Sequence, residues 1–175
     1  MGKHCLNKLS GNITVGCTIA PVGVKDIYLM HAEDVTFAFD SATGCISTAT
    51  FAPGTKSYLV EGYKQNIQVN GSLKSLDAAA SMDASVTFKV QYGPGTAAFV
   101  STMTTGKFYV LVRYNGDFST ILGATVPLEC SAADFDSNAN AGMVTITLAT
   151  PEGAAGCPMK VPFNAARDTI ISKSV

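Results

Sequence analysis

The sequence predicts an all-β protein with one short helix, and three observations support this class. Apolar residues recur at every second position through most of the chain, which is the period of a half-buried strand. Glycine and proline separate these segments, as turn residues do between strands. Only residues 96–105 show helical spacing. A chain of 175 residues is long enough to bury a core, so one domain over residues 1–175 is expected.

Four segments carry the strand pattern. The segment "VKDIYLMH" is apolar on both faces, so we expect cover on both sides. The other three each have one apolar face and one polar face. Their apolar faces are Val35, Phe37 and Phe39; Val86, Phe88 and Val90; and Val144, Ile146 and Leu148.

The helical segment is "TAAFVSTMTT", residues 96–105. Its apolar side is formed by Ala98, Phe99 and Met103 with Thr102. Thr96 is placed to cap the helix, and Gly106 is placed to end it.

The segment "FYVLVRYNGDFSTILGA" predicts a hairpin that turns at Asn115 and Gly116. An Asn-Gly pair between apolar runs favours a two-residue type I′ turn. That turn sets Tyr114 opposite Asp117 and Val110 opposite Ile121. Because residues 108–112 are apolar on both faces, this strand is expected to be central.

A second Asn-Gly pair, at residues 70–71, keeps the alternation in phase on both sides. We therefore expect one long strand over residues 57–76, with Gly71 at a bulge or bend. Such a strand is longer than one small sheet needs, so something outside the domain is expected to receive it. Its polar face comprises Lys64, Asn66, Gln68, Asn70, Ser72 and Lys74, which are the candidates for a subunit interface or a lumen.

Composition limits the classes of function that the chain can have. Charged residues make up 14% of the chain and hydrophobic residues 47%, so part of the apolar surface is expected to lie against other chains. The net charge is −1 without a basic cluster, which disfavours tight nucleic-acid binding. The longest apolar run, Phe108 to Val112, has five residues, far below the roughly 20 of a membrane span. No apolar stretch follows the first lysines as in a secretory signal.

The residues that could carry chemistry are few. Five cysteines without a C-x-x-C pair favour reduced, mostly buried thiols over a zinc site or a disulfide framework. His4 and His31 are the two histidines. His31 with Glu33 and Asp34 forms either the edge of a metal site or, as we favour, a solvated turn.

The loop "DFDSNANAG" alternates oxygen-bearing side chains at Asp134, Asp136, Asn138 and Asn140, as a calcium loop does. It lacks the glycine and the terminal acid of an EF-hand, so a polar turn is favoured. We predict no catalytic residue, metal or cofactor. A hydrolase that uses Asp134 or Asp136 stays as an alternative hypothesis.

Taken together, several segments resemble bacteriophage tail-tube proteins and the related ring proteins of virion necks and tails, especially those of phages of gut bacteria. The segments are "GVKDIYLMHAEDVTFAFDSATGCIS", "SYLVEGYKQNIQVNGSLKSLD", "GKFYVLVRYNGDFSTILGATVPLE", "SAADFDSNANAG" and "MVTITLATPE", so the resemblance covers about residues 20 to 150. The N-terminal arm, 1–20, and the C-terminal tail, 151–175, fall outside it.

The resemblance implies a tail-tube-like β-sandwich or partly closed barrel with a long extended strand or hairpin. It implies a ring-forming homo-oligomer, a hexamer or dodecamer, in a virion tail or neck assembled in the host cytoplasm. The arm and the tail would contact neighbouring subunits, other tail or neck proteins would cap the ring, and genomic DNA would pass without specific binding. The alternative is a β-sandwich binding module of a phage fibre or an accessory virion protein, although the chain has no tryptophan for an aromatic platform.

Overall fold

The computed structural model of the chain describes residues 23–62, 66–76, 79–116, 118–135, 142–152 and 159–175. Within these residues the chain forms eleven strands and two helices. The first six strands are β1 (Val24–His31), β2 (Val35–Phe39), β3 (Ile46–Phe51), β4 (Tyr58–Glu61), β5 (Ile67–Leu76) and β6 (Ala79–Gln91). They are followed by α1 (Ala97–Thr105), β7 (Lys107–Tyr114), β8 (Ser119–Leu122), β9 (Leu128–Phe135), β10 (Met143–Ala149), β11 (Met159–Lys160) and α2 (Asn164–Ser172).

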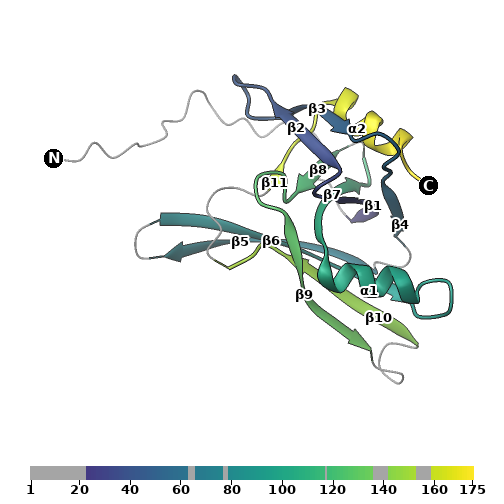
Figure 1. Cartoon of the computed structure of the whole chain (residues 1–175). Helices are drawn as coiled ribbons and strands as arrows, with labels where there is room; N and C mark the ends of the chain where they lie inside the picture. Colours follow the sequence, from purple (N-terminus) through teal and green to yellow (C-terminus); the bar gives the residue numbers. More distant parts are fainter. Residues whose placement is uncertain (1–22, 63–65, 77–78, 117, 136–141, 153–158) are drawn as a thin grey trace.

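Strand β7 organises the main sheet, which has nine strands among the described residues. One edge of β7 pairs with β1, and β4 lies beyond β1. The other edge pairs with β9 at Lys107 and Phe108 and with β8 further along. The sheet therefore divides at β7. The part with the order β9-β10-β6-β5 is called here the lower sheet, because it lies below the rest of the molecule in Figure 1.

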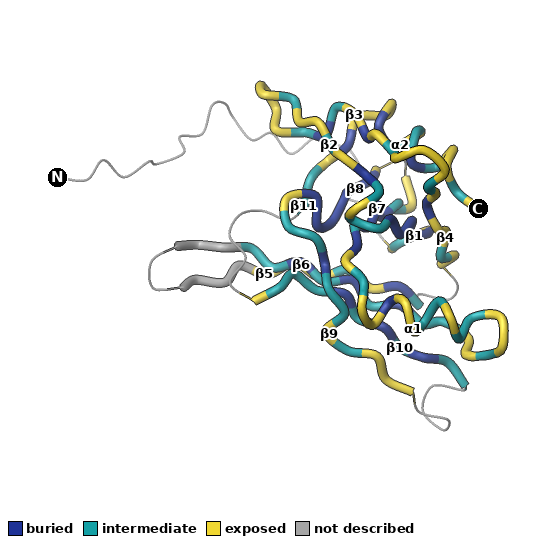
Figure 2. Tube along the Cα trace, viewed as in Figure 1, coloured by how far each residue is buried: buried dark blue, intermediate teal, exposed yellow. Residues whose placement is uncertain are grey.

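Two apolar cores lie on opposite faces of β1 and β7. The first core contains Ile27 and Val110 together with the inner side of the lower sheet, and α1 contributes Met103. The second core contains Tyr28 and Leu111, and it is closed by the hairpin of β2 and β3 and by α2. The layer between these two cores, formed by β1, β7 and β8, is the most deeply buried part of the chain, as Figure 2 shows. Burial of this apolar surface is the main favourable term in folding.

The structure confirms the all-β class with a short helix, and the main sheet is not closed. Strand β1 is buried on both sides, because its alternate residues enter different cores. Strand β7 is central, as expected. The expected apolar face of β10 is buried throughout. In β2 the exception is Phe39 at the end of the strand, which is 44% exposed.

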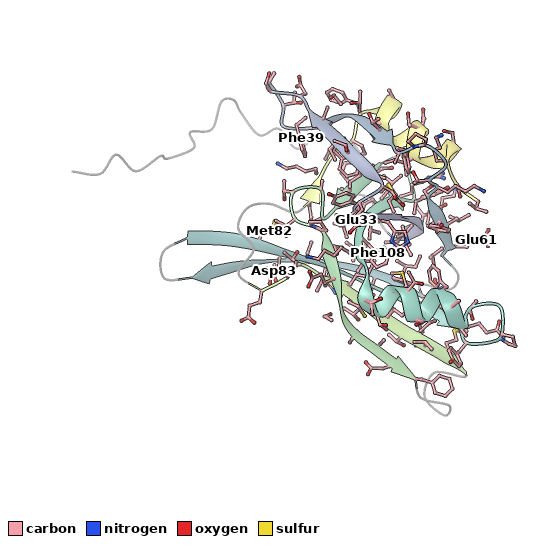
Figure 3. The ribbon with its side chains drawn as sticks, in the orientation of Figure 1. Glu33, Phe39, Glu61, Met82, Asp83 and Phe108 are labelled. Atoms are coloured by element: carbon pink, nitrogen blue, oxygen red, sulfur yellow. The ribbon has the colours of Figure 1, made fainter. Side chains whose placement is uncertain are left out.

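Helix α1 forms where the sequence predicts it, but its ends differ from the prediction. The Thr96 hydroxyl does not cap the helix; it donates to the Gln91 carbonyl at 2.6 Å. Gly106 has φ −87°, which does not require glycine. A Cβ at Gly106 would lie 2.5 Å from the Phe108 ring, so packing explains this glycine. Figure 3 shows Phe108 close to α1.

The second helix, α2, was not predicted. It lies in the C-terminal tail and buries Ala166 and Ile170 in the second core. Its sequence, "NAARDTIIS", has a short apolar stripe and begins after Phe163 without a side-chain cap. Tertiary packing, and not an N-cap signal, therefore holds this helix.

The predicted two-residue turn at Asn115 and Gly116 is wrong by one residue. Val110 pairs with Leu122 and not with Ile121, and the Tyr114 N–H donates to the Phe118 carbonyl at 3.0 Å. The loop thus contains residues 115–117. A slip of one residue exchanges the faces of a strand, but β8 is buried at every position, so alternation could not fix the register.

The predicted single strand over residues 57–76 is also wrong. The chain forms two strands there, β4 beside β1 and β5 beside β6. After β4, the Gly62 N–H donates to the Lys25 carbonyl at 3.0 Å. The pairing of β5 with β6 runs through Gly71 without a register shift, so no bulge lies there. Instead, β5 and β6 form a long hairpin that projects from the body of the molecule (Figure 1).

Candidate assembly interface

The lower sheet has one apolar face and one polar face. Its inner face contributes Val86, Phe88, Val144 and Ile146 to the first core. Side chains alternate along a strand, so the intervening residues form the other face, called here the outer face. In β5 the outer face contains Gln68, Asn70 and Ser72, all exposed. The lower sheet thus presents a broad polar surface on one side and the core on the other.

Hydroxyl and amide groups run across the outer face in rows. Gln68 pairs with Thr87, which pairs with Thr147, and Thr147 pairs with Ala132 of β9. The Thr87 and Thr147 hydroxyls are hydrogen-bonded at 3.0 Å. Cross-strand pairs of this kind add modest stability to a sheet. This row of the outer face therefore carries uncharged side chains.

The hydrogen bonds of Ala84 determine which backbone groups face the free edge of β5. The Thr150 N–H donates to the Ala84 carbonyl, and the Ala84 N–H donates to the Thr150 hydroxyl, so both Ala84 groups point toward the β10 side of β6. In an antiparallel ladder the direction alternates from residue to residue. Ser85 therefore bonds to Asn70 across β6 and β5. It follows that Ile67, Val69 and Gly71 direct their N–H and C=O groups away from β6.

The same alternation defines the free edge of β9. Strand β9 pairs with β7 only at Glu129 and Leu128. The alternation that begins at Ala84 directs the backbone groups of Ile146 toward β6 and those of Thr145 toward β9. Asp134 pairs with Thr145, so the intervening Ala133 and Phe135 direct their backbone groups away from β10. Among the described residues, no strand pairs with β5 on the side away from β6, or with β9 beyond Glu129. Both long edges of the lower sheet are therefore open in the described part of the chain.

The two open edges are complementary. All neighbours in the order β9-β10-β6-β5 are antiparallel, and the number of strands is even, so β9 and β5 run in opposite directions. If a second copy were placed beside the first by rotation about an axis along the strands, its β9 would lie antiparallel to the first copy's β5. Open edges are templates for such pairing.

The sequence candidates fall on this surface where the structure describes them. Asn66 continues the outer face next to β5, before Gln68, Asn70 and Ser72. Lys64 lies outside the described residues, and only the backbone of Lys74 is described, within β5. The turn residues Asn115 and Gly116 lie apart from the lower sheet, because the Asn115 N–H donates to the Gly23 carbonyl.

Of the described residues considered for chemistry, the structure brings His31, Glu33 and Asp34 to the lining of one pocket. The His31 ring packs on Phe108, with centroids 4.9 Å apart, while Glu33 and Asp34 lie in the turn after β1. Asp134 lies in β9; His4, Asp136, Asn138 and Asn140 are outside the described residues. Within the part of the chain that is described, no three His, Cys, Asp or Glu residues form a metal-binding group.

Two of the five cysteines are described. Cys45 and Cys130 are free and half-buried, so both are less buried than expected. Burial raises the pKa of the Cys130 thiol, while a hydrogen bond with the Ala132 backbone acts in the opposite direction. Cys5, Cys17 and Cys157 lie outside the described residues.

Sequence reasoning missed the open edge of β9 and an aromatic pair next to it. Tyr92 and Phe135 are 52% and 57% exposed, with ring centroids 5.8 Å apart. Phe135 ends β9, and Tyr92 follows β6. The segment "ECSAADF" has too few apolar residues to show the alternation of a strand. The sequence therefore gives no clear signal for this edge.

Comparison with known proteins adds no relative. No family model, curated protein or solved structure matches this chain. None of the helices in the described residues has the length and apolar character needed to cross a membrane.

Proposed function

We propose that this chain is a structural virion protein that assembles side by side into a ring, as part of a phage tail tube or of a neck or tail conduit for DNA. The observation that carries the proposal is the lower sheet, whose β9 and β5 edges are open and run in opposite directions. Pairing of β5 with β9 of the next copy satisfies backbone groups that one chain leaves to solvent.

A contact between two different edges is heterologous, so each added copy exposes the same open edge again. Such contacts give a closed ring when the rotation closes and a filament when it does not. A hexamer or a dodecamer is proposed from the family resemblance given above.

The outer face of the lower sheet is the surface we assign to the lumen. Its inner face is already occupied by the first core, so the polar outer face is the one left for the passage. The charges described there have both signs and include Lys89, Asp83 and Asp134. A neutral, hydroxyl-rich lining lets DNA move without the counterion release that drives tight binding.

Both ends of the chain are proposed to contact neighbouring subunits. The N-terminal arm, 1–20, lies outside the described residues. The described part of the C-terminal tail packs on its own chain, where β11 pairs with β8 and α2 covers the second core. It also exposes Val161 and Phe163 at 41% and 42%, which are available to a neighbouring subunit or to other tail or neck proteins. The virion is the proposed location, after assembly in the host cytoplasm.

Negative-stain microscopy of the purified full chain, with sedimentation velocity over a wide concentration range, tests the proposal. We expect rings or tubes with a central hole, and a sedimenting species several times heavier than the 18.2 kDa chain. A protein that stays strictly monomeric at high concentration contradicts the proposal. Activity lost on substituting Asp134, with assembly unchanged, would instead support the hydrolase hypothesis.

The exposed pair Tyr92 and Phe135 favours one alternative, a binding module of a phage fibre or an accessory virion protein. Aromatic rings presented to solvent are a common platform for sugars. This alternative predicts that the monomer binds host-surface oligosaccharides and that Tyr92→Ala abolishes binding without loss of fold. The ring proposal predicts no such binding.

A further inference from the structure

A cavity of about 260 Å³ lies where β1, the β7–β8 hairpin and α2 meet, remote from the lower sheet. Its lining includes Lys25 at the start of β1, Arg113 and Ser119 on the hairpin, and Arg167 and Asp168 on α2. Two arginines and a lysine from three separate elements therefore line one small space. The assembly interface described above does not use any of these residues.

Both arginines are largely shielded from solvent. The side chains of Arg113 and Arg167 are only 27% and 22% exposed. A charged group that is partly removed from water needs compensating hydrogen bonds or an opposite charge. The question is therefore whether the N–H donors of the two guanidinium groups already have acceptors within the protein.

The described protein partners use only part of the donor capacity of the two guanidinium groups. Arg167 donates from Nε to Asp168 Oδ1 at 2.9 Å, and the Asp168 side chain is 62% exposed. Arg113 donates from Nη1 to the Tyr28 hydroxyl at 3.1 Å, and its nitrogen lies 3.6 Å from Asp26 Oδ2, which exceeds hydrogen-bond length. Each guanidinium carries five N–H donors, and among the described residues one N–H of each group has a hydrogen-bond acceptor in the protein.

The charge balance at the cavity is positive. Among the described residues, the lining holds three positive charges, on Lys25, Arg113 and Arg167, and one negative charge, on Asp168; Asp26, which pairs with Arg113, adds a second negative charge and leaves a net charge of +1. The Ser119 side chain adds a hydroxyl donor to the lining. Forked guanidinium groups beside an ammonium and a hydroxyl match an oxyanion with several acceptor oxygens.

We infer that this cavity binds a phosphoryl oxyanion, with Arg167, Arg113 and Lys25 as its ligands. The group is either free phosphate or the phosphate of a small ester such as a nucleotide, since both present the same oxygens. The inference is independent of ring assembly, because the cavity and the lower sheet share no residue.

Titration calorimetry of the full chain with inorganic phosphate and with adenosine monophosphate tests the inference. Arg167→Gln and Lys25→Gln are the test variants, because Arg113 also pairs with buried Asp26 and its loss would disturb the fold. Lys107→Gln is the matched control. Lys107 lies at the other end of β7 from Arg113, about 20 Å away at the usual rise of a strand.

We expect saturable binding of at least one probe, about tenfold or more weaker in each test variant and unchanged in Lys107→Gln. Tighter binding of adenosine monophosphate than of phosphate assigns the site to a phosphate ester, and the reverse assigns it to the free ion. Thermal unfolding checks that each variant is folded. The inference is overturned if neither probe saturates, if chloride or acetate competes equally well, or if Lys107→Gln weakens binding as much as the test variants.

Discussion

A proline at Ala133 tests how the subunits join. Ala133 is exposed in β9, and its N–H is directed to the open edge, as the pairing of Asp134 with Thr145 requires. Ala133→Pro therefore removes a donor that the isolated chain does not use. Proline is tolerated on an edge strand when its missing N–H faces outward, so the monomer should keep its fold.

The expected loss of association free energy follows from the number of backbone groups that the β9 edge offers. Ala133 and Phe135 each offer one N–H and one C=O to a neighbouring β5, which makes four backbone hydrogen bonds at each subunit contact. At about 0.5–1.5 kcal/mol net for each bond, the pairing contributes about 2–6 kcal/mol. The proline ring also holds the partner strand beyond the roughly 4.8 Å spacing of a ladder. We expect a loss of about 2 kcal/mol or more per contact, which weakens each association about 30-fold.

Sedimentation velocity and negative-stain microscopy measure assembly, and circular dichroism measures the fold. We expect rings from the unmodified chain and from the control Ala133→Ser, which keeps the N–H, and monomers from Ala133→Pro with little change in Tm. Ala132→Pro is the contrasting variant, because the Ala132 N–H is directed toward its partner Thr147 in β10; it should lower Tm. Rings from a folded Ala133→Pro chain would refute pairing through the β9 edge.

Three further predictions concern the folded chain. A methyl group in Gly62→Ala would lie 2.3 Å from the Lys25 carbonyl oxygen; we expect urea unfolding to show a loss of about 1–3 kcal/mol, and unchanged stability would contradict the close approach. Burial raises the pKa of Asp26, partly opposed by Arg113, so the folded chain holds this proton more tightly than the unfolded chain and the Asp26 contribution to stability falls as pH rises above 3.8. Asp26→Asn should remove that slope from the unfolding free energy, and an identical pH profile would count against it. Burial also raises the pKa of Cys130, so its alkylation at pH 8 should be slow in the folded chain and fast in urea; equal rates would contradict this.

The sequence by itself determined the elements whose pattern was unambiguous. Strand β10 alternates Val144 and Ile146 with threonine. A period of two with β-branched residues predicts a strand and not a helix. Strand β7 is apolar on both faces, so its central place followed from burial alone. The short helix α1 followed from the spacing of Phe99 and Met103.

Only the tertiary structure decided the register of the β7–β8 hairpin, the break after β4 and the existence of α2. In the hairpin, Ile121 and Leu122 are equally apolar, so burial did not discriminate between the two alignments. The break after β4 depends on the hydrogen bond from the Gly62 N–H to the Lys25 carbonyl of β1. Helix α2 forms because Ala166 and Ile170 pack in a core built by segments that are distant in the sequence.

The polar face proposed for the lumen was visible as alternation in "NIQVNGS". The two open edges could not be predicted from the sequence. An edge is defined by the absence of a neighbouring strand, and pairing between segments far apart in the chain has no local sequence signal.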